Sequence, residues 1–332
     1  MSNKILVTGG AGYIGSHTCK MLKAQGFQPV VYDNLSRGHA WAIQWGPLVK
    51  GDLQETERLV RTLQEHQIKA VVHFAALAYV GESVQKPELY YENNFGGSLS
   101  LLKAMQKADV KKIVFSSTCA TYGNPQTDSL AETHPQNPIN PYGQSKLMVE
   151  KLLQDAVHAW GLQAVSLRYF NAAGADPDGD IGEAHDPETH LIPLAVQAGL
   201  GKLKEILIFG NDYPTPDGTC LRDYIHVNDL ASAHILALKK LLADEISYDV
   251  FNLGTGQGYS VLQIIDQVSE LLGFKVVSRF VNRRPGDPAK LVADAKKALD
   301  LLGWKAQSSD LKTLIHSAIL WEKKQLKSVA KP

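Results

Sequence analysis

The chain has 332 residues, in which 34 Lys plus Arg balance 34 Asp plus Glu, so its formal net charge is zero. A composition that is 44% hydrophobic and 20% charged excludes a disordered chain, and the length suggests about two domains. No Lys/Arg-rich run provides an electrostatic footprint for nucleic acid, so we expect bound anions to be held by a few local groups.

Alternating apolar and amphipathic segments run through the first half of the chain. The short apolar runs predict strands at residues 4–8, 28–33, 70–76, 111–117 and 164–170. The longer amphipathic runs predict helices at residues 13–25, 54–66, 89–107 and 142–160. Strands that alternate with helices of this length predict an α/β fold with a doubly wound parallel sheet of the Rossmann type.

The character of the sequence changes after Asn171. Residues 174–188 are rich in Gly, Pro and Asp and are expected to form a loop, and the elements beyond them are shorter. We therefore predict a first domain over residues 1–170 and a smaller α/β domain over residues 171–332. Residues 223–236 are a candidate segment for returning to the first domain.

A glycine-rich turn follows the first predicted strand and precedes the first predicted helix. Gly9, Gly12 and Gly15 give the spacing G-x-x-G-x-x-G. Glycines allow the backbone to approach a pyrophosphate, and the free N–H groups of the helix N-terminus bind it. Asp33 ends the next strand, 18 residues after Gly15, where a carboxylate accepts hydrogen bonds from ribose hydroxyls and repels a 2′-phosphate. The pattern predicts NAD as cofactor in the first domain.

Two further strand ends are expected above the same edge of the sheet. They carry Asp52 and Leu53, and then Phe74, Ala75 and Ala76, where the adenine and the cofactor ribose would lie.

Tyr142 and Lys146 form a Y-x-x-x-K pair on one face of a predicted helix. A nearby ammonium and a cationic nicotinamide would both favour the phenolate over the phenol. Thr118 ends a strand of the same sheet and could relay a proton from a substrate oxygen. These three residues are the predicted catalytic groups.

The glycine-rich turn, the hydroxyl of Thr118 and the Y-x-x-x-K pair together resemble the extended short-chain dehydrogenase/reductase family. Within it, the chain is most similar to enzymes that invert C4 of a UDP-sugar. The similar segments are residues 73–87, 90–94, 140–146, 167–175, 208–231 and 283–294. The resemblance extends from the first strand to about residue 304, essentially the whole chain.

The resemblance implies an isomerase of galactose metabolism that converts UDP-galactose to UDP-glucose. Tyr142 takes the proton of the sugar 4-hydroxyl, directly or through Thr118, while the C4 hydride moves to NAD. The 4-keto sugar then turns over, and the hydride returns to its opposite face. The smaller domain would bind the UDP-sugar.

The resemblance also implies which residues bind the two ligands. The implied cofactor residues are Gly9, Gly12, Tyr13, Ile14, Gly15, Asp33, Asn34, Asp52, Leu53, Phe74, Ala75, Ala76, Asn94, Thr118, Tyr142, Lys146, Tyr169 and Phe170. The implied substrate residues are Thr118, Tyr142, Asn171, His190, Leu191, Phe209, Arg222, Arg284, Asp287 and Leu291. Arg222 has a second interpretation, a structural ion pair with Asp223 or Asp229.

Four positions depart from the pattern of the family. Thr118 replaces a Ser, Ala78 replaces a Lys near the cofactor phosphates, and His190 replaces an Asn at the uracil end. Leu291 stands where a bulky Tyr excludes N-acetyl groups and a small residue admits them. UDP-N-acetylhexosamines and the pair UDP-xylose/UDP-arabinose therefore remain alternative substrates.

Two other functions fit the sequence less well. Dehydratases and decarboxylases of the family place acidic residues after the Thr, where this chain has Cys119 and Ala120. A non-catalytic NAD-binding protein would be expected to lack Tyr142 or Lys146.

Localisation and assembly can also be predicted. Cys19, Cys119 and Cys220 are unclustered, which favours a reducing compartment and argues against a zinc site. No apolar run approaches the roughly 18 residues of a membrane span, and no signal peptide is recognisable. We expect a cytoplasmic protein without a metal.

The helices at 89–107 and 142–160 carry extra apolar stripes, and family members commonly form homodimers through such helices.

Overall fold

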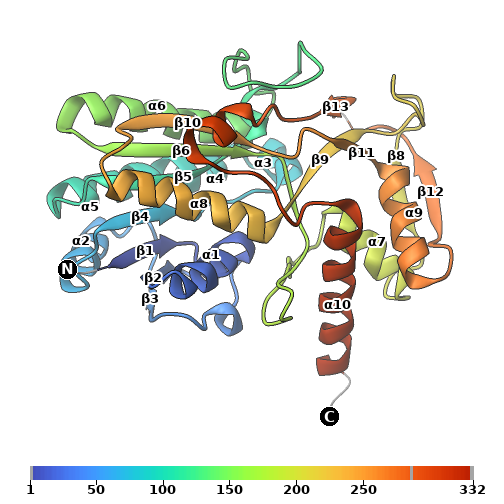
Figure 1. Cartoon of the computed structure of the whole chain (residues 1–332), viewed down its shortest axis with the longest axis horizontal. Coiled ribbons are helices and arrows are strands. Elements are labelled where there is room, and N and C mark those ends of the chain that lie inside the picture. Colours follow the sequence, from blue (N-terminus) through green and yellow to red (C-terminus); the bar gives the residue numbers. More distant parts are fainter. Residues whose placement is uncertain (1–2, 285–286, 330–332) are drawn as a thin grey trace.

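The computed structural model describes residues 3–284 and 287–329. Its largest element is a parallel sheet with the strand order β10-β6-β5-β4-β1-β2-β3 (Figure 1). The strands are β1 (Lys4–Thr8), β2 (Gln28–Asp33), β3 (Leu48–Lys50), β4 (Ala70–His73), β5 (Lys112–Thr118), β6 (Gln163–Tyr169) and β10 (Tyr248–Leu253). The predicted doubly wound parallel α/β sheet is therefore confirmed.

Helices cover both faces of this sheet, because successive side chains of a buried strand point to opposite sides. In β1, Ile5 and Val7 join one core cluster and Leu6 joins the other. The Ile5 side is covered by α1 (Tyr13–Ala24) and α8 (Val227–Leu242). The Leu6 side is covered by α2 (Thr56–Glu65), α5 (Gly97–Lys107) and α6 (Pro141–Trp160).

The chain reverses its winding direction at β1, which has β2 on one side and β4 on the other. A crevice opens at the carboxyl ends of the strands at such a switch point, and ligands of α/β proteins bind there. The β1–α1 turn and the ends of β4 and β5 all lie at this edge.

A second group of elements packs around its own core beside this edge, at the right of Figure 1. One sheet contains β7 (Asn171–Ala173), β9 (Leu221–His226), β11 (Gly258–Ser260) and β13 (Lys290–Leu291). A pair of strands, β8 (Ile206–Phe209) and β12 (Ser278–Val281), lies near helices α7 (Leu191–Gly199), α9 (Val261–Leu272) and α10 (Leu311–Val329). Ile192, Ile264 and Leu314 are fully or almost fully buried where the three helices meet.

Two elements from the second half of the chain belong to the layers of the large sheet, one as a covering helix and one as a strand. Helix α8 packs against α1, and β10 pairs in parallel with β6. The returning segment thus extends beyond residue 236, as far as Leu253. The division into domains at residues 170 and 171 stays a prediction.

The stretch predicted as one helix at residues 89–107 is divided in the structure. Helix α4 (Pro87–Tyr90) passes into a π-helical segment (Tyr91–Gly96) before α5 begins. Inside the π-helical segment, the Asn94 amide accepts from the backbone N–H of Leu77 and donates to its carbonyl, at 2.8 and 3.0 Å. Segments of π-helix occur mostly as single turns inside α-helices, frequently at functional sites.

The remaining elements are short. They are helix α3 (Val80–Gln85), the 3₁₀ turns Ala40–Ala42 and Cys119–Thr121, and a second π-helical segment, Ala298–Leu302. Of the helices in the described part of the chain, none combines the length and the apolar character needed to cross a membrane.

Candidate active site

A cavity of about 1430 Å³ lies at the carboxyl edge of the large sheet and continues between the two groups of elements. The predicted residues that line it are Gly9, Gly12, Tyr13, Ile14, Gly15, Asp33, Asn34, Asp52, Leu53, Phe74, Ala75, Ala76, Thr118, Tyr142, Lys146, Tyr169, Phe170, Asn171, His190, Leu191, Phe209, Arg222, Arg284, Asp287 and Leu291. Asn94 is predicted as a cofactor residue but lies behind the wall, 1% exposed, with its amide bonded to Leu77 and Ser145.

The glycine-rich turn is packed tightly, both within itself and against the segment that follows β4. Gly9 has a φ of +71°, and a Cβ there would lie 2.6 Å from the backbone nitrogen of Ala75. A Cβ at Gly15 would lie 2.2 Å from the carbonyl oxygen of Gly9. Only glycine fits these two positions, so backbone N–H groups at the start of α1 stay open to the cavity for a pyrophosphate.

Asp33 is held at the end of β2 by two backbone groups. Its carboxylate accepts hydrogen bonds from the N–H groups of Ala11 at 3.0 Å and Leu35 at 2.8 Å. Burial raises the pKa of Asp33, although these two hydrogen bonds oppose the shift. The fixed carboxylate and the glycine turn form the cradle that an adenosine ribose and a pyrophosphate need, so the chain's residues fit NAD.

Thr118 and Tyr142 meet at one point of the cavity wall. Thr118 ends β5, and Tyr142 is the second residue of α6, which begins at Pro141 and is capped by Asn140 through a 2.8 Å bond from the N–H of Gly143. The Thr118 hydroxyl is within hydrogen-bonding reach of the phenol. Burial raises the pKa of Tyr142, an effect that this hydrogen bond opposes.

Lys146 lies one turn further along α6. Its Nζ donates to the carbonyl oxygen of Ser116 at 2.8 Å. Burial lowers the pKa of Lys146 to about 7, against the opposing attraction of Glu150. The sequence led us to expect an ammonium that lowers the pKa of Tyr142. In the protein without ligands, burial dominates both groups: it raises the pKa of Tyr142 and lowers that of Lys146.

Arg222 stands on β9 and faces the far end of the cavity. It donates to the carbonyl of Pro288 at 2.8 Å and pairs with the Asp287 carboxylate at 3.3 Å. Asp223 accepts instead from the backbone of Thr255, Gly256 and Ala293, which makes it part of the framework. The alternative that pairs Arg222 with Asp223 is therefore not what the structure shows.

Arg284 and Phe209 form a second pair at this end. The guanidinium carbon lies 3.9 Å from the centre of the Phe209 ring, which is a cation–π contact. Leu291 on β13 pairs in register with Arg222 on β9 and also lines the cavity. Two residues of the similar segment 283–294, Pro285 and Gly286, lie outside the described residues.

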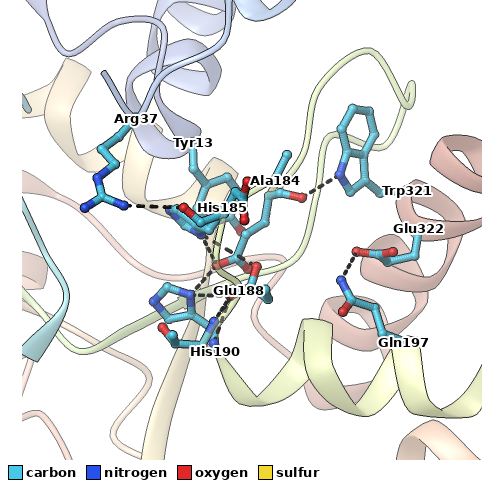
Figure 2. A network of polar contacts seen from close by, with 12 residues as sticks. Tyr13, Arg37, Ala184, His185, Glu188, His190, Gln197, Trp321 and Glu322 are labelled. Atoms are coloured by element: carbon cyan, nitrogen blue, oxygen red, sulfur yellow. Dashed lines mark hydrogen bonds and ion pairs between the residues drawn. The ribbon is translucent and has the colours of Figure 1, made fainter. Parts of the chain in front are cut away.

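The loop before α7 contains a polar cluster of which only His190 was predicted from the sequence as a site residue. Figure 2 shows His185, Glu188 and His190 directed toward one another, and Glu183 belongs to the same cluster. Both imidazole Nδ1 atoms lie about 3 Å from one Glu183 oxygen, at 3.0 Å for His185 and 2.9 Å for His190. Their spacing, E-x-H-x-x-E-x-H, is visible in the sequence and could have identified them.

The electrostatics of this cluster follow from its composition. Burial lowers the pKa of His190, but Glu183 and Glu188 outweigh that effect and raise it to about 10. For His185 the same balance raises the pKa to about 9. Burial would raise the pKa of Glu188, yet hydrogen bonds from the two imidazoles lower it to about 2.

The sequence of the chain is similar to that of a known enzyme family. The model of the NAD dependent epimerase/dehydratase family matches residues 5–254. A UDP-glucose 4-epimerase of Halalkalibacterium halodurans is 50% identical over 319 residues, which are 96% of this chain and 95% of the relative.

Solved structures agree with this relationship. The UDP-glucose 4-epimerase of Brucella ovis in complex with NAD has a TM-score of 0.94 and 51% identity, and the match covers 96% of this chain and 98% of that one. The enzyme of Stenotrophomonas maltophila, with bound NAD and formylated UDP-arabinopyranose, also has a TM-score of 0.94, with 44% identity over 98% and 99% of the two chains. With this fold, this glycine-rich turn and this match over three quarters of its length, the chain belongs to the NAD dependent epimerase/dehydratase family.

Proposed function

We propose that this chain is an isomerase that inverts C4 of a UDP-sugar with NAD, converting UDP-galactose to UDP-glucose. The observation that carries the proposal is the position of Tyr142, which shares one cavity with the NAD cradle on one side and with Arg222 and Arg284 on the other. The family and the names of the relatives support the same reaction.

The phenol of Tyr142 moves the proton of the reaction. The sugar O4–H bond breaks as its proton passes to Tyr142, directly or through the Thr118 hydroxyl that lies within reach. NAD held by the glycine-rich turn and Asp33 would supply the acceptor, and then the donor, of the C4 hydride. Tyr142 gives the proton back to O4 when the other face of the sugar is presented, so the reaction has no net redox change.

The protonation state of Tyr142 links the two ligands. Since burial keeps Tyr142 a phenol in the protein alone, its conversion to the base requires positive charge close by. Lys146, which donates to the Ser116 carbonyl oxygen, supplies one such charge when it is protonated, and the cationic nicotinamide of bound NAD would supply another. Proton removal is thereby restricted to molecules that have cofactor in place.

The diphosphate end is held by groups that have the matching charge and shape. Arg222 and Arg284 offer guanidiniums to two phosphates, Phe209 offers a ring face to the uracil, and Asp287 offers a carboxylate to ribose hydroxyls. Firm binding of the nucleotide leaves the hexose free to turn, because the remote groups supply the binding energy.

The proposal is tested with purified protein and UDP-galactose, without added NAD. Formation of UDP-glucose, together with NAD released on denaturation, is the expected result. A chain that contains no NAD and takes none up would contradict the proposal, and so would full activity of a Tyr142→Phe variant.

The size of Leu291 also favours a second class of substrates, the UDP-N-acetylhexosamines. It is half-buried in the cavity wall, and its branched side chain is intermediate in size between the residues that would exclude and admit an N-acetyl group. UDP-N-acetylhexosamines are therefore candidate substrates beside UDP-hexoses, and relative turnover on the two classes decides between them. UDP-xylose and UDP-arabinose belong in the same comparison.

The chain's assembly and location also form part of the proposal. Leu99 on α5 and Met148 and Leu152 on α6 remain only half-buried in the single chain. Pairing these helices with those of a second copy would bury the three side chains, so we expect a homodimer. A monomeric mass in light scattering at micromolar concentration would contradict this.

The three free, buried cysteines support a reducing, cytoplasmic location.

A further inference from the structure

Four side chains of one loop converge on a single point of the cavity wall. Glu183, His185, Glu188 and His190 lie between β7 and α7, and each offers one ligand atom within 4.8 Å of the others. From this geometry we propose that the cluster is a binding site for one divalent transition-metal ion of the zinc class. The sequence predicted no metal, because Cys19, Cys119 and Cys220 are unclustered.

The donor set is the one that such ions prefer. Zinc is bound by imidazole nitrogen and carboxylate oxygen at about 2.0–2.2 Å, with four ligands arranged as a tetrahedron. Two imidazoles and two carboxylates complete that number, and their mixed N/O character also suits manganese, iron and cobalt.

The distances within the cluster match the edges of such a polyhedron. A tetrahedron with bonds of this length has edges of about 3.3 Å. The four imidazole-to-carboxylate distances bracket that value: His190 Nδ1 lies 2.8 Å from Glu188 and 2.9 Å from Glu183, and His185 Nδ1 lies 3.0 Å from Glu183 and 3.7 Å from Glu188. All pairs of ligand atoms lie within 4.8 Å of one another, which is the spread that four ligands around one ion require.

The loop holds these ligands in place through other contacts. The Glu188 carboxylate accepts from the backbone N–H groups of Thr189 at 2.7 Å and His190 at 2.8 Å. The indole of Trp321 donates to the carbonyl oxygen of Glu183 at 2.7 Å (Figure 2). The glutamate side chains are only 5% and 9% exposed, whereas those of His185 and His190 are 24% and 40% exposed, so a bound ion would have buried carboxylates behind it and imidazoles on its open side.

Charge balance also favours a cation at this place. Two nearly buried carboxylates stand beside a cavity that, on the proposed function, receives two diphosphates. Two protonated imidazoles or one divalent ion would each cancel the two negative charges. In the ion-bound form both Nδ1 atoms lose their protons to solvent as the two metal–nitrogen bonds form.

A second carboxylate cluster differs because a lysine already neutralises it. Asp176, Asp178 and Asp180 also converge, but Lys20 Nζ lies between them at 2.7, 2.7 and 3.0 Å. The lysine ammonium already occupies the position of a cation there. In the Glu183–His190 cluster, the charged partners of the carboxylates are groups that can themselves become metal ligands.

The position of the cluster suggests what the ion would do. His185 makes edge contacts with the rings of Tyr13 and Tyr79, on the cofactor side of the cavity, with centroids 6.1 and 5.9 Å apart. His190 caps α7 and precedes Leu191, on the substrate side. The ion would fix the loop that joins these two walls.

The site is tested by zinc retention in the NAD-containing protein. Tag-free protein is stripped with a chelator, equilibrated with low-micromolar Zn²⁺ alone, separated from free metal and measured by elemental analysis. We expect one zinc per chain, and a visible cobalt(II) spectrum of four-coordinate form when Co²⁺ replaces zinc. The His185→Ala/His190→Ala variant should bind at least about 100-fold more weakly.

Controls separate loss of ligands from loss of structure. Glu188→Gln keeps the size of the side chain but removes an anionic ligand, and should also lose zinc while retaining NAD. The His158→Ala/His316→Ala variant removes two exposed histidines far from the cavity and should retain one zinc per chain and full activity.

Two results would overturn the site: no zinc bound by the unaltered chain, which would identify a proton-only cluster, or equal zinc in the His185→Ala/His190→Ala variant. Because zinc is measured without substrate, either result leaves the proposed epimerisation standing, and absence of epimerisation leaves the zinc measurement unaffected.

Discussion

The Nζ of Lys146 donates to the carbonyl oxygen of Ser116 at 2.8 Å, two residues before Thr118 on the same strand. One hydrogen bond thus joins the helix that carries Tyr142 to the strand that carries the hydroxyl beside it. The relative position of the proton-transfer groups is fixed by a contact to the backbone, and it does not depend on a ligand. Removing any of these three side chains should therefore affect chemistry more than binding.

Tyr142→Phe should reduce kcat by about 1000-fold, because the phenyl ring keeps the shape but cannot exchange a proton. The amount of NAD that copurifies should not change. Thr118→Ser should keep most of the activity, since the hydroxyl remains, whereas Thr118→Ala should lose it. The measurement is the rate of UDP-glucose formation at saturating UDP-galactose. If Thr118→Ala were as active as Thr118→Ser, the hydroxyl would have no part in the proton path.

Lys146→Met should abolish activity and yet stabilise the NAD-free protein. The folded-state pKa of Lys146 is lowered from 10.5 to about 7, so the native state binds fewer protons than the unfolded state between these values. Stability therefore rises with pH through this window, and the cost of the buried charge is complete below pH 7. The methionine variant should gain a few kcal/mol below pH 7, and the gain should disappear above about pH 10.5.

Thermal unfolding as a function of pH measures this difference. Lys151→Met alters an exposed lysine on the same helix and should change the melting temperature by little at any pH. A Lys146→Met gain that did not shrink as the pH rises would mean that packing, and not the buried charge, is responsible.

The success and failure of the sequence predictions have distinct physical causes. Strands β1 and β2 have the predicted bounds, because each is a continuous apolar run that ends at a glycine-rich turn or at Asp33. The cofactor cradle and the Tyr142–Lys146 pair were found for the same reason, since short local patterns define them. These features require no knowledge of which distant segments meet.

Strand β10 and the Glu183–His190 cluster depend on distant contacts. β10 joins the sheet through β6, and its Asn252 side chain is held by Tyr122 and Leu130, more than 100 residues away. The loop of the cluster has the composition of an ordinary turn, and contacts with Trp321 and His39, both distant in the sequence, help to hold it in its compact form. Asn94 similarly matches a cofactor residue in sequence, but in the structure its amide forms hydrogen bonds with Leu77 and Ser145.

Glu150→Gln should destabilise the protein by about 3–5 kcal/mol, because it leaves the buried guanidinium of Arg168 without its counter-charge. The carboxylate of Glu150 accepts from Arg168 Nε at 2.9 Å and Nη2 at 2.6 Å, and both side chains are 5% exposed or less. The matched control is Glu57→Gln, which breaks the exposed pair with Lys107 and should cost less than about 1 kcal/mol. Equal losses in chemical denaturation would show that burial of the pair is unimportant.

Leu291→Tyr should change substrate preference without removing activity. Leu291 lines the cavity on β13, beside Arg222 on β9, so a larger ring there would occupy space needed by a 2-acetamido group but not by a hydroxyl. We expect the ratio of kcat/KM for UDP-N-acetylgalactosamine over UDP-galactose to fall by about 10-fold or more, and to rise in Leu291→Ala. Lys290→Tyr adds the same ring one residue earlier on the strand, at a position that does not line the cavity, and should leave the ratio unchanged. An unchanged ratio in both Leu291 variants would place the sugar's 2-substituent elsewhere in the cavity.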